Sequence, residues 1–541
     1  MQDVAAPRPA TVAARGMVTC SHVLASTAGV AMLRAGGSAV DAGIAAAAVL
    51  SVVYPHMTSI GGDSFWLVHP ASTGGVRFLD GGGRAPAGAT IAAFEARGLA
   101  AVPYRGVLPA TVTVPGAVDS WLEAHAAYGR LPLPRVLAPA IECARDGFAV
   151  GARLAYWIAS MATTFAESPE AAAIFLPEGR PPGEGQRLRN PNLARTLEAI
   201  AATGRGGFYE GEVAREIARW SRARGGLIEE GDLRAQRARW GEPLSSTYRG
   251  ITLYETPPPT QGVSVLQMLR LIEPYDLGAM EFLGPDHVHL LVQAKQIAFH
   301  DRDRVLADPD FAKVPVERLL SPEYATERRR LVDMRRALPW DEVPSFGTLA
   351  GDTVYVAAVD AEGSAASLIH SVYGLFGSGV VAGRTGVVMQ NRGAYFSLDP
   401  AHPNRLEPGK RPLHTLIASL AFRGDRLWQV MGCMGADGQP QIHLQAYTAM
   451  IDFGLDVQQA MEAPRWLSGR FGLLEPRDLL NLEGRFPPTT GAELARRGHT
   501  VNQWGPWNER AGHAHGITID PATGARHGGC APRSDGVALG Y

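Results

Sequence analysis

The chain has 541 residues, a formal net charge of −2, 46% hydrophobic residues and 19% charged residues. A nearly neutral chain of this kind lacks the basic excess of a nucleic-acid-binding protein, and its length allows one large α/β domain or two smaller ones. Its four cysteines lie far apart and form no C-x-x-C pair, which excludes a disulfide framework and a cysteine-based zinc site.

Targeting signals are not evident in the sequence. The first residues, MQDVAAPRPATVAARGMVTCSH, contain no uninterrupted apolar stretch of the kind found in signal peptides. No run of about 18 apolar residues occurs, so we expect no transmembrane helix. A cytoplasmic protein without nucleic-acid or membrane partners is therefore the expectation.

The N-terminal part begins with two expected helices, at 21–35 and 41–53, with Asp41 as the N-cap of the second. A loop containing Gly61-Gly62 follows and leads into a buried strand at 65–68. Such a glycine-bearing loop can bring its backbone close to a ligand, or it can simply make a tight turn. Both interpretations stay open.

A second strand is expected at 76–80 and ends in three glycines followed by Arg84. Because the glycines clear space around it, Arg84 could bind an anion, although a solvated loop arginine is the more common outcome. The region 185–330 is predicted to be mostly helical, with His289 and His300 at the surface or in caps rather than as metal ligands. A proline triplet at 257–259 could form a rigid wall beside a site.

Residues 351–379 carry the strongest chemical signal. Thr353, Tyr355, Ala357 and Val359 alternate with Val354, Val356 and Ala358 in the pattern of a buried strand, a turn follows at 361–364, and a second strand is expected at 365–373, so the segment is predicted to be a β-hairpin. The residues just before it, RRALPWDEVPSFGTLAGD, have no helical or strand period and should form a mobile loop.

Cleavage at the junction of this loop and the first strand would create a reactive residue. If the bond between Asp352 and Thr353 is cut, Thr353 gains a free α-amine beside its own hydroxyl. The α-amine has an unperturbed pKa of about 7.7–8.0, so it can act as the base for that hydroxyl. An ordinary β-branched residue opening a strand is the alternative interpretation.

Two later segments are candidates for ligand or metal chemistry. Glycines at 432–438 precede a helix expected at 441–453, and N–H groups at such a junction can stabilise an oxyanion or simply cap the helix. His513 and His515 would share one strand face, but no third ligand is near in sequence, which argues against a metal site. The glycine spacing at 377–383 does not match a dinucleotide-binding fingerprint. We therefore expect neither a metal nor a cofactor.

Nine segments of the chain are informative when they are considered together. They are AGGSAVDAGIAAAAVLSVVYPHMTSIGGDSF (35–65), TVPGAVDSW (113–121), GFYEG (207–211), ADPDF (307–311), DTVYVAAVDAEGSA (352–365), FGSGVVAG (376–383), PGKRPLHTL (408–416), IDFGLDVQQAMEAPRW (451–466) and APRSDGVALGY (531–541). In their order and spacing, more than in any one of them, these segments resemble the γ-glutamyltranspeptidase family of N-terminal-nucleophile hydrolases over nearly the whole chain.

The resemblance implies a four-layer αββα sandwich and a precursor that cuts itself before Thr353. A large fragment, 1–352, and a small fragment, 353–541, would then stay intertwined as a heterodimer in one globular domain, with further dimerisation left open. The family's nucleophile falls on Thr353, and the hydroxyl that steadies it falls on Ser371. The glycine pair of the oxyanion hole falls on Gly435 and Ala436, where the second glycine is replaced but the backbone N–H is kept.

The family's substrate-recognition residues do not carry over in the same way. The arginine that holds the substrate carboxylate in γ-glutamyl enzymes would fall on Gly82, and the nearest arginine, Arg84, comes two residues later. The other recognition positions of the family fall on Tyr373, Arg392, Tyr395, His414 and Thr415. The ammonium group of a γ-glutamyl substrate needs acceptors or anions, which this set of residues does not supply.

The resemblance therefore implies an amidohydrolase whose γ-glutamyl specificity is lost, similar to a branch that includes oxamate amidohydrolase. A small amide that bears a carboxylate but no ammonium group would suit a pocket with Arg84 and Arg392. A γ-glutamyl hydrolase or transferase and a β-lactam side-chain acylase are the enzymatic alternatives. An unprocessed precursor that serves as a scaffold is the non-enzymatic one.

Overall fold

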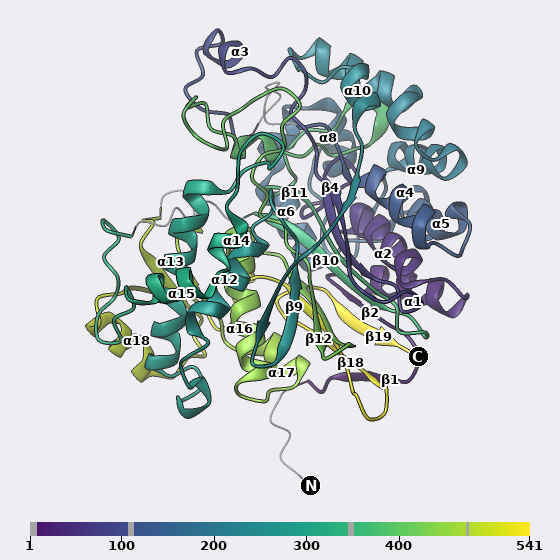
Figure 1. Ribbon diagram of the computed structural model, residues 1–541. Helices are drawn as coiled ribbons and strands as arrows, with labels where there is room; N and C mark the ends of the chain where they lie inside the picture. The colour runs from purple at the N-terminus through teal and green to yellow at the C-terminus, as the bar shows by residue number, and fades with distance from the viewer. Residues whose placement is uncertain (1–7, 106–112, 344–350, 472–474) are drawn as a thin grey trace.

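The computed structural model describes residues 8–105, 113–343, 351–471 and 475–541. In this part of the chain two seven-stranded antiparallel sheets lie face to face, and helices cover the outer side of each sheet (Figure 1). The order of the layers is therefore helix, sheet, sheet, helix. This arrangement confirms the αββα sandwich expected from the family resemblance.

The first sheet contains the strand that opens with the candidate nucleophile, and this strand lies between two others in the sheet. The strand order is β19 (Val537–Gly540), β2 (Met17–Cys20), β10 (Asp352–Val359), β11 (Ala365–Tyr373), β3 (Asp63–His69), β4 (Arg77–Gly81) and β7 (Arg239–Gly241).

The second sheet packs against the inner face of the first and combines strands from both ends of the chain. The order is β1 (Thr11–Ala13), β18 (Arg526–Cys530), β17 (Ala514–Ile519), β13 (Arg426–Cys433), β12 (Ser419–Arg423), β9 (Ile251–Glu255) and β8 (Leu244–Tyr248). Smaller pairings outside the two sheets involve β5 (Phe148–Ala149), β6 (Arg187–Leu188), β14 (Trp466–Ser468), β15 (Leu479–Leu482) and β16 (Thr500–Gln503).

The two helical layers come from different parts of the chain (Figure 1). The layer over the first sheet contains α1 (Val23–Arg34), α2 (Ala39–Val53), α4 (Ala117–Tyr128), α5 (Leu133–Asp146), α9 (Pro191–Thr203) and α10 (Glu212–Ala223). The layer over the second sheet contains α12 (Gly262–Ile272), α13 (Pro285–Val305), α16 (Gln439–Ile451) and α17 (Val457–Glu462). Shorter peripheral helices are α3 (Ile91–Glu95), α6 (Ala152–Ser160), α7 (Ala162–Ala166), α8 (Pro169–Phe175), α11 (Glu230–Ala235), α14 (Val316–Leu319), α15 (Pro322–Arg329) and α18 (Pro488–Arg496).

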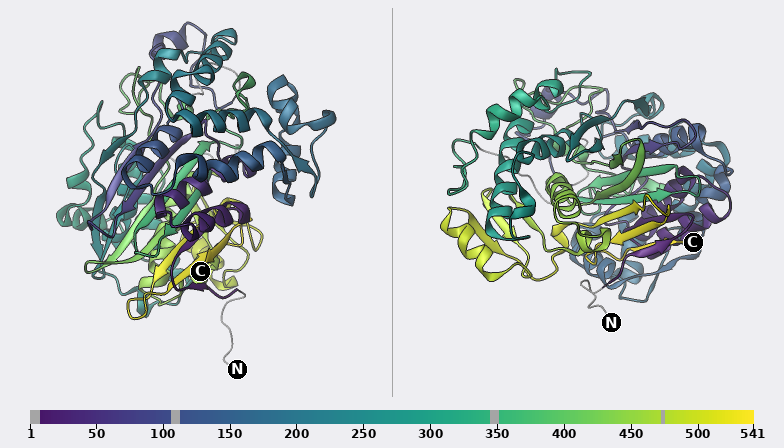
Figure 2. Two further views of the ribbon diagram at one scale, coloured as in Figure 1. Left: turned by 90° about the vertical axis from the view of Figure 1, so that its right-hand side faces the viewer. Right: turned by 60° about the horizontal axis from the view of Figure 1, so that its bottom comes forward.

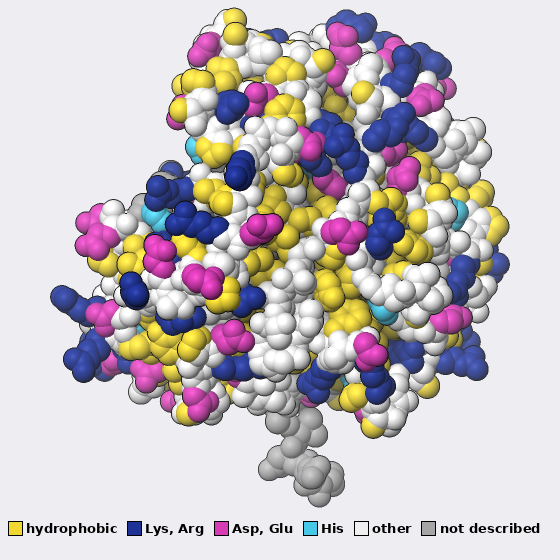
Figure 3. All heavy atoms as spheres, viewed as in Figure 1, with side chains coloured by type: hydrophobic (Ala, Val, Ile, Leu, Met, Phe, Trp, Pro, Cys, Tyr) yellow, Lys and Arg dark blue, Asp and Glu magenta, His cyan; other side chains and the backbone are white. Residues whose placement is uncertain are grey.

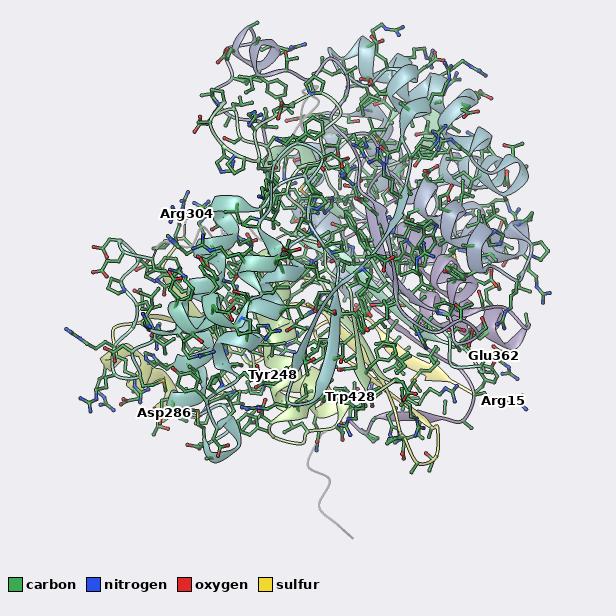
Figure 4. The ribbon with its side chains drawn as sticks, viewed as in Figure 1. Arg15, Tyr248, Asp286, Arg304, Glu362 and Trp428 are labelled. Carbon is green, nitrogen blue, oxygen red and sulfur yellow. The ribbon has the colours of Figure 1, made fainter. Side chains whose placement is uncertain are left out.

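Strand β10 is buried on both faces, which explains its continuous apolar sequence. Tyr355 and Ala357 point into the core between the two sheets, whereas Val354 and Val356 point into the core beneath α1 and α2. The predicted hairpin is confirmed, because β10 pairs antiparallel with β11 around the turn at 360–364. In Figure 4, Glu362 marks this turn at the right-hand edge of the molecule, away from Arg304 in α13.

Two expectations about single residues are wrong. Asp41 is not the N-cap of α2, because the helix begins at Ala39 and Ser38 caps it in a capping box with Asp41. The Asp41 carboxylate instead accepts the Ser38 N–H at 2.8 Å, so it reaches back one turn. His289 is fully buried rather than exposed, with its Nδ1 2.7 Å from His499 Nε2, because α13 is enclosed by its neighbours.

Segments near both ends of the chain lie side by side in the first sheet, where β19 pairs with β2 near the label C in Figure 2.

On the face shown in Figure 3 basic and acidic side chains are interspersed. No helix among the described residues has the length and apolar character needed to cross a membrane. In the segment 335–352, which is predicted to be a loop, residues 335–343 contain no helix or strand, and 344–350 lie outside the described residues.

Candidate active site

The hydroxyl of Thr353 lies at the start of β10 in a short chain of hydrogen bonds. Thr353 Oγ1 donates to Ser371 Oγ at 3.1 Å, and Ser371 Oγ donates to the carbonyl oxygen of Asp352 at 2.6 Å. Thr353 and Ser371 are both almost completely buried. The hydroxyl that could attack the bond between Asp352 and Thr353 is thus linked through one serine to the carbonyl of that same bond.

The position of Ser371 is fixed by the backbone on two sides. The N–H of Tyr373 donates to Ser371 Oγ at 2.7 Å, and Tyr373 has a φ of 77°, which side-chain-bearing residues rarely adopt. Gly62 packs against Ser371 so closely that a Cβ atom there would lie 2.1 Å from the Ser371 carbonyl oxygen. The glycine-bearing loop before β3 therefore lets two backbone segments meet beside the hydroxyls, and this contact requires glycine at position 62.

The loop between β13 and α16 provides free backbone donors. Gly435 and Ala436 have φ values of 137° and 47°, and within the described residues neither N–H donates a hydrogen bond to an acceptor. A Cβ atom on Gly351 would lie 2.9 Å from Ala436 Cβ, so this loop adjoins the segment just before Thr353. The geometry suits an oxyanion hole, in which two unpaired N–H groups face the reacting carbonyl.

A buried network that the sequence analysis did not identify holds the loop between β13 and α16. Gln261 Nε2 donates to the carbonyl oxygens of Ala436 at 2.9 Å and of Thr415 at 2.8 Å. Arg302 Nη1 lies 2.6 Å from both Gln261 Oε1 and Asp437 Oδ1. Gln261 follows the proline triplet, and this proximity to a rigid segment was the one sequence signal that could have pointed to it.

Arg392 is a buried cation, and two of its three nitrogen atoms have no hydrogen-bond acceptor among the described residues. Its Nη1 donates to Thr415 Oγ1 at 2.9 Å, whereas its Nε and Nη2 have no hydrogen-bond partner among the described residues. The guanidinium lies 4.4 Å from the ring centre of Tyr373 and 5.7 Å from that of Tyr395. Burial lowers the pKa of Arg392 from its ordinary value. Two unsatisfied donors on a buried guanidinium are suited to an anionic ligand.

His414 forms a buried pair with Asp63, a residue that the sequence analysis did not single out. His414 Nε2 lies 2.9 Å from Asp63 Oδ2. Asp63 Oδ1 accepts the N–H of Gly83 at 2.7 Å and the Nε2 of Gln390 at 2.9 Å. Burial raises the pKa of Asp63 to about 6, and burial together with the charge of Arg392 keeps the pKa of His414 well below its usual range.

Arg84 makes its contacts in a different cluster. Its Nη1 donates to the carbonyl oxygen of Gly409 at 2.9 Å, and its Nη2 lies 3.7 Å from Asp310 Oδ2. Asp310 also pairs with Arg411, which binds Asp308. The structure thus brings Tyr373, Arg392, Tyr395, His414 and Thr415 together by direct contact or chain neighbourhood, whereas no contact joins Arg84 to them in the described part of the chain.

The histidines considered as metal ligands have other surroundings. His513 lies just before β17, and His515 Nε2 is 3.1 Å from Ser21 Oγ. Within the described ranges no group of three or more His, Cys, Asp or Glu side chains is arranged to hold a metal ion.

Comparison with known proteins places this chain in a family. A sequence model of the family described as gamma-glutamyltranspeptidase matches residues 25–541. The chain is 41% identical to the glutathione hydrolase-like YwrD proenzyme of Bacillus subtilis and 41% identical to the oxamate amidohydrolase proenzyme of Klebsiella pneumoniae. Each alignment covers 98% of this chain and 99% of the relative.

A solved structure shows the same fold along the whole chain. The crystal structure of cephalosporin acylase from Bacillus halodurans superposes with a TM-score of 0.91 at 39% identity, over 100% of this chain and 99% of that one. The chain therefore belongs to the gamma-glutamyltranspeptidase family of N-terminal-nucleophile hydrolases, enzymes that act on amide bonds.

Proposed function

We propose that this protein is a self-cleaving N-terminal-threonine amidohydrolase that hydrolyses a small amide carrying a carboxylate. One observation carries the proposal: the Thr353 hydroxyl is linked through Ser371 to the Asp352 carbonyl. The relatives described as proenzymes support a processing step in this chain as well.

In the proposed processing step, Thr353 Oγ1 attacks the carbonyl carbon of Asp352. Its proton passes to Ser371 Oγ, and Ser371 gives its own proton to the carbonyl oxygen, which becomes the hydroxyl of a neutral tetrahedral intermediate. Collapse of the intermediate breaks the C–N bond, returns a proton to the Thr353 nitrogen and leaves an ester on Oγ1. Water then hydrolyses the ester, which leaves a carboxylate on Asp352 and a free amine and hydroxyl on Thr353.

The strand order supports fragments that stay together after this cut. Strands of the large fragment, 1–352, pair with strands of the small fragment, 353–541. In the first sheet β2 pairs with β10 and β19, and β3 pairs with β11. In the second sheet β1 pairs with β18, and β9 pairs with β12. Both sheets are therefore shared between the fragments. Separating the fragments would break both sheets and expose the core between them.

In the proposed turnover, the new α-amine takes the proton of the Thr353 hydroxyl and the oxygen attacks the substrate amide. The N–H groups of Gly435 and Ala436 stabilise the tetrahedral oxyanion, and the amine returns its proton to the leaving nitrogen. Water hydrolyses the acyl-enzyme by the same steps. Each donor of this kind lowers the barrier by about 2.7–4 kcal/mol.

Arg392 is the reason for proposing a substrate that carries a carboxylate. Its buried guanidinium has two donor nitrogens without described partners, a geometry that matches a carboxylate. The same charge would repel an ammonium group, which disfavours a γ-glutamyl substrate. Arg84 is engaged by Gly409 and Asp310, so we assign the carboxylate to Arg392.

A β-lactam side-chain acylase is the second candidate. It is supported by the similarity to the Bacillus halodurans acylase and by the aromatic rings of Tyr104, Tyr373 and Tyr395, which contact one another and could pack against a larger acyl group.

A substrate panel on processed protein tests these assignments. Intact mass measurement should first show two chains divided between Asp352 and Thr353. Oxamate, its neutral methyl ester analogue, a γ-glutamyl anilide and a β-lactam with an acidic side chain are then compared by kcat/KM. Hydrolysis of oxamate far above the other three supports the proposal, whereas preference for the γ-glutamyl anilide would reject it.

A further inference from the structure

The pair formed by Asp63 and His414 controls which ring nitrogen of the histidine carries a proton. Asp63 Oδ2 lies 2.9 Å from His414 Nε2. An ionised carboxylate can only accept hydrogen bonds, so the proton between them must be on Nε2. In the neutral imidazole the other nitrogen, Nδ1, is then an acceptor with a free lone pair.

The carboxylate of Asp63 cannot turn to offer a different arrangement. Its Oδ1 accepts from the Gly83 N–H and from Gln390 Nε2, so two donors hold this oxygen and leave Oδ2 for His414. The backbone of Gly83 packs closely against Val114, because a Cβ atom on Gly83 would lie 2.0 Å from the carbonyl oxygen of Val114. The protein thus fixes Asp63 as an acceptor toward His414.

No hydrogen-bond donor among the described residues reaches Nδ1 of His414. His414 is fully buried, and within the described residues its Nδ1 has no hydrogen-bond partner. An unpaired buried acceptor is costly. Other buried histidines, among them His370 and His443, also have a ring nitrogen without a described partner, so it is the nearby charge of Arg392 that distinguishes His414. His414 is followed by Thr415, whose Oγ1 accepts from Arg392, so the free acceptor and the free donors of Arg392 are joined through one intervening residue.

The surroundings also determine the charge of a hydrogen-bond donor that could bind Nδ1 of His414. Burial and, after it, the charge of Arg392 lower the pKa of His414, so the two side chains are within electrostatic range of each other. A cationic donor at Nδ1 would be repelled by the same guanidinium. A hydroxyl or an amide N–H can donate to Nδ1 without this penalty.

We propose that Asp63 fixes His414 in the Nε2–H tautomer so that Nδ1 accepts a hydrogen bond from an uncharged donor located next to the substrate carboxylate. The inference rests on the proposed function, because it takes Arg392 as the ligand of that carboxylate. It narrows the substrate class to amides in which the carboxylate is accompanied by a hydroxyl or amide N–H. His414 is then a specificity-determining residue, and Asp63 is a positioning residue that acts through it.

The Asp63→Asn variant should reverse the polarity of His414. The position of Oδ1 receives two N–H donors, so the amide oxygen of the new side chain should occupy it. The amide NH₂ would then face Nε2 and donate to it, which moves the ring proton to Nδ1. The acceptor in the pocket becomes a donor with almost no change in shape.

Two matched substrates report this change. Hydroxymalonamate carries a hydroxyl beside the carboxylate, and its methyl ether carries only an acceptor at the same place. In the natural protein kcat/KM should favour the hydroxyl compound by about 10- to 100-fold, the effect of one hydrogen bond in a buried site. In Asp63→Asn the ratio should fall to one or invert. An unchanged ratio in a folded variant would overturn the inference.

The tautomer itself can be measured without turnover. Ring-nitrogen NMR of ¹⁵N-histidine-labelled, processed protein should show His414 with the proton on Nε2 in the natural chain and on Nδ1 in Asp63→Asn. The His414→Gln variant identifies the signal. Hydroxymalonate should shift the Nδ1 resonance on binding and bind more tightly than methoxymalonate; a natural protein with the proton on Nδ1 would overturn the inference.

A second buried pair of a carboxylate and a histidine provides a control. His443 Nδ1 lies 2.9 Å from Glu255 Oε1, and against the effect of burial the charge of Glu255 raises the pKa of His443 to about 10, so this histidine, unlike His414, is a cation at neutral pH. Neither residue hydrogen-bonds to the proposed pocket residues in the described part of the chain. Glu255→Gln should change the His443 signal and leave the substrate ratio as it is. A ratio that changes equally in both variants would contradict a local role for Asp63. Loss of all amide hydrolysis in the natural protein would instead reject the proposed function, while the NMR and binding results would still test the tautomer.

Discussion

The groups proposed for the reaction and the groups proposed for substrate recognition differ in kind. The proposed reaction groups are the hydroxyls of Thr353 and Ser371 and the backbone N–H groups of Gly435 and Ala436, and close backbone contacts such as that of Gly62 with Ser371 hold them. The proposed recognition groups are large side chains, above all Arg392 and His414, which are buried and have polar atoms without a partner among the described residues.

This difference teaches why chemistry and specificity can change separately within one fold. A backbone N–H is the same in every residue except proline, so an alanine can stand at position 436 without removing the donor. A side chain that recognises a substrate has no such redundancy. Replacing one recognition residue should alter the substrate, whereas replacing one reaction residue should stop the reaction.

The largest effect is expected at the nucleophile. Thr353→Ala should abolish both self-cleavage and turnover, because it removes the hydroxyl that acts in each. Denaturing gels and intact mass measure cleavage, and Thr353→Ser, which keeps a hydroxyl, is the matched control. Two fragments in the Thr353→Ala protein would contradict self-cleavage by this residue.

The next largest effect is expected at Ser371, which links the Thr353 hydroxyl to the Asp352 carbonyl. Ser371→Ala should slow processing by about 10²–10⁴-fold, the usual contribution of a positioned proton-transfer group. The rate is followed by the appearance of the small fragment over time, with Ser371→Thr as the variant that keeps the hydroxyl. Processing at the natural rate in Ser371→Ala would show that the serine is a spectator.

A smaller and selective effect is expected on the recognition side. Arg392→Gln should lower kcat/KM for oxamate by about 10- to 150-fold, the range for hydrogen bonds to a charged group. Cleavage into two fragments should be unchanged, and the neutral ester analogue should lose little. Equal losses for the charged and neutral substrates would mean that Arg392 supports the fold rather than the carboxylate.

The pH dependence should show a weaker contribution from Asp63. The α-amine of Thr353, with an ordinary pKa of about 7.7–8.0, makes log kcat/KM fall with a slope of one below that pH. Burial raises the pKa of Asp63 to about 6, and its carboxylate form, the one that accepts from His414, exists above that value. A second proton should therefore steepen the slope to two below pH about 6. In Asp63→Asn the slope should stay at one, and a slope of two there would assign the second proton elsewhere.

The smallest effect is expected at the side chain of Asp352. Burial and the nearby Glu509 carboxylate raise the pKa of Asp352 to about 8, so the carboxyl is largely neutral at pH 7. Asparagine has nearly the same shape as the neutral acid, and only the backbone carbonyl takes part in the proposed cut. Asp352→Asn should consequently yield the same two fragments at a similar rate, and an uncut chain would show that the side chain is needed.

Local sequence determined the element that carries the chemistry. The apolar run of β10, the turn at 361–364 and the polar residue at the strand opening are short-range patterns, because side-chain alternation and turn residues depend only on near neighbours. The family resemblance added the sandwich, which the layers confirm. It also supplied Thr353, Ser371, Gly435 and Ala436 as catalytic candidates, which remain predictions although Thr353 and Ser371 lie in contact.

Only the tertiary structure decided which side chains meet beyond that hairpin. Asp63 and His414 are 351 residues apart in the chain, and no spacing rule relates them. Arg84 follows Gly83 directly in sequence, yet its side chain turns to Gly409 and Asp310 while the backbone N–H of Gly83 binds Asp63. The physical reason is that periodicity fixes the face of an element, whereas the partner on that face depends on how strands far apart in the chain align in the sheets.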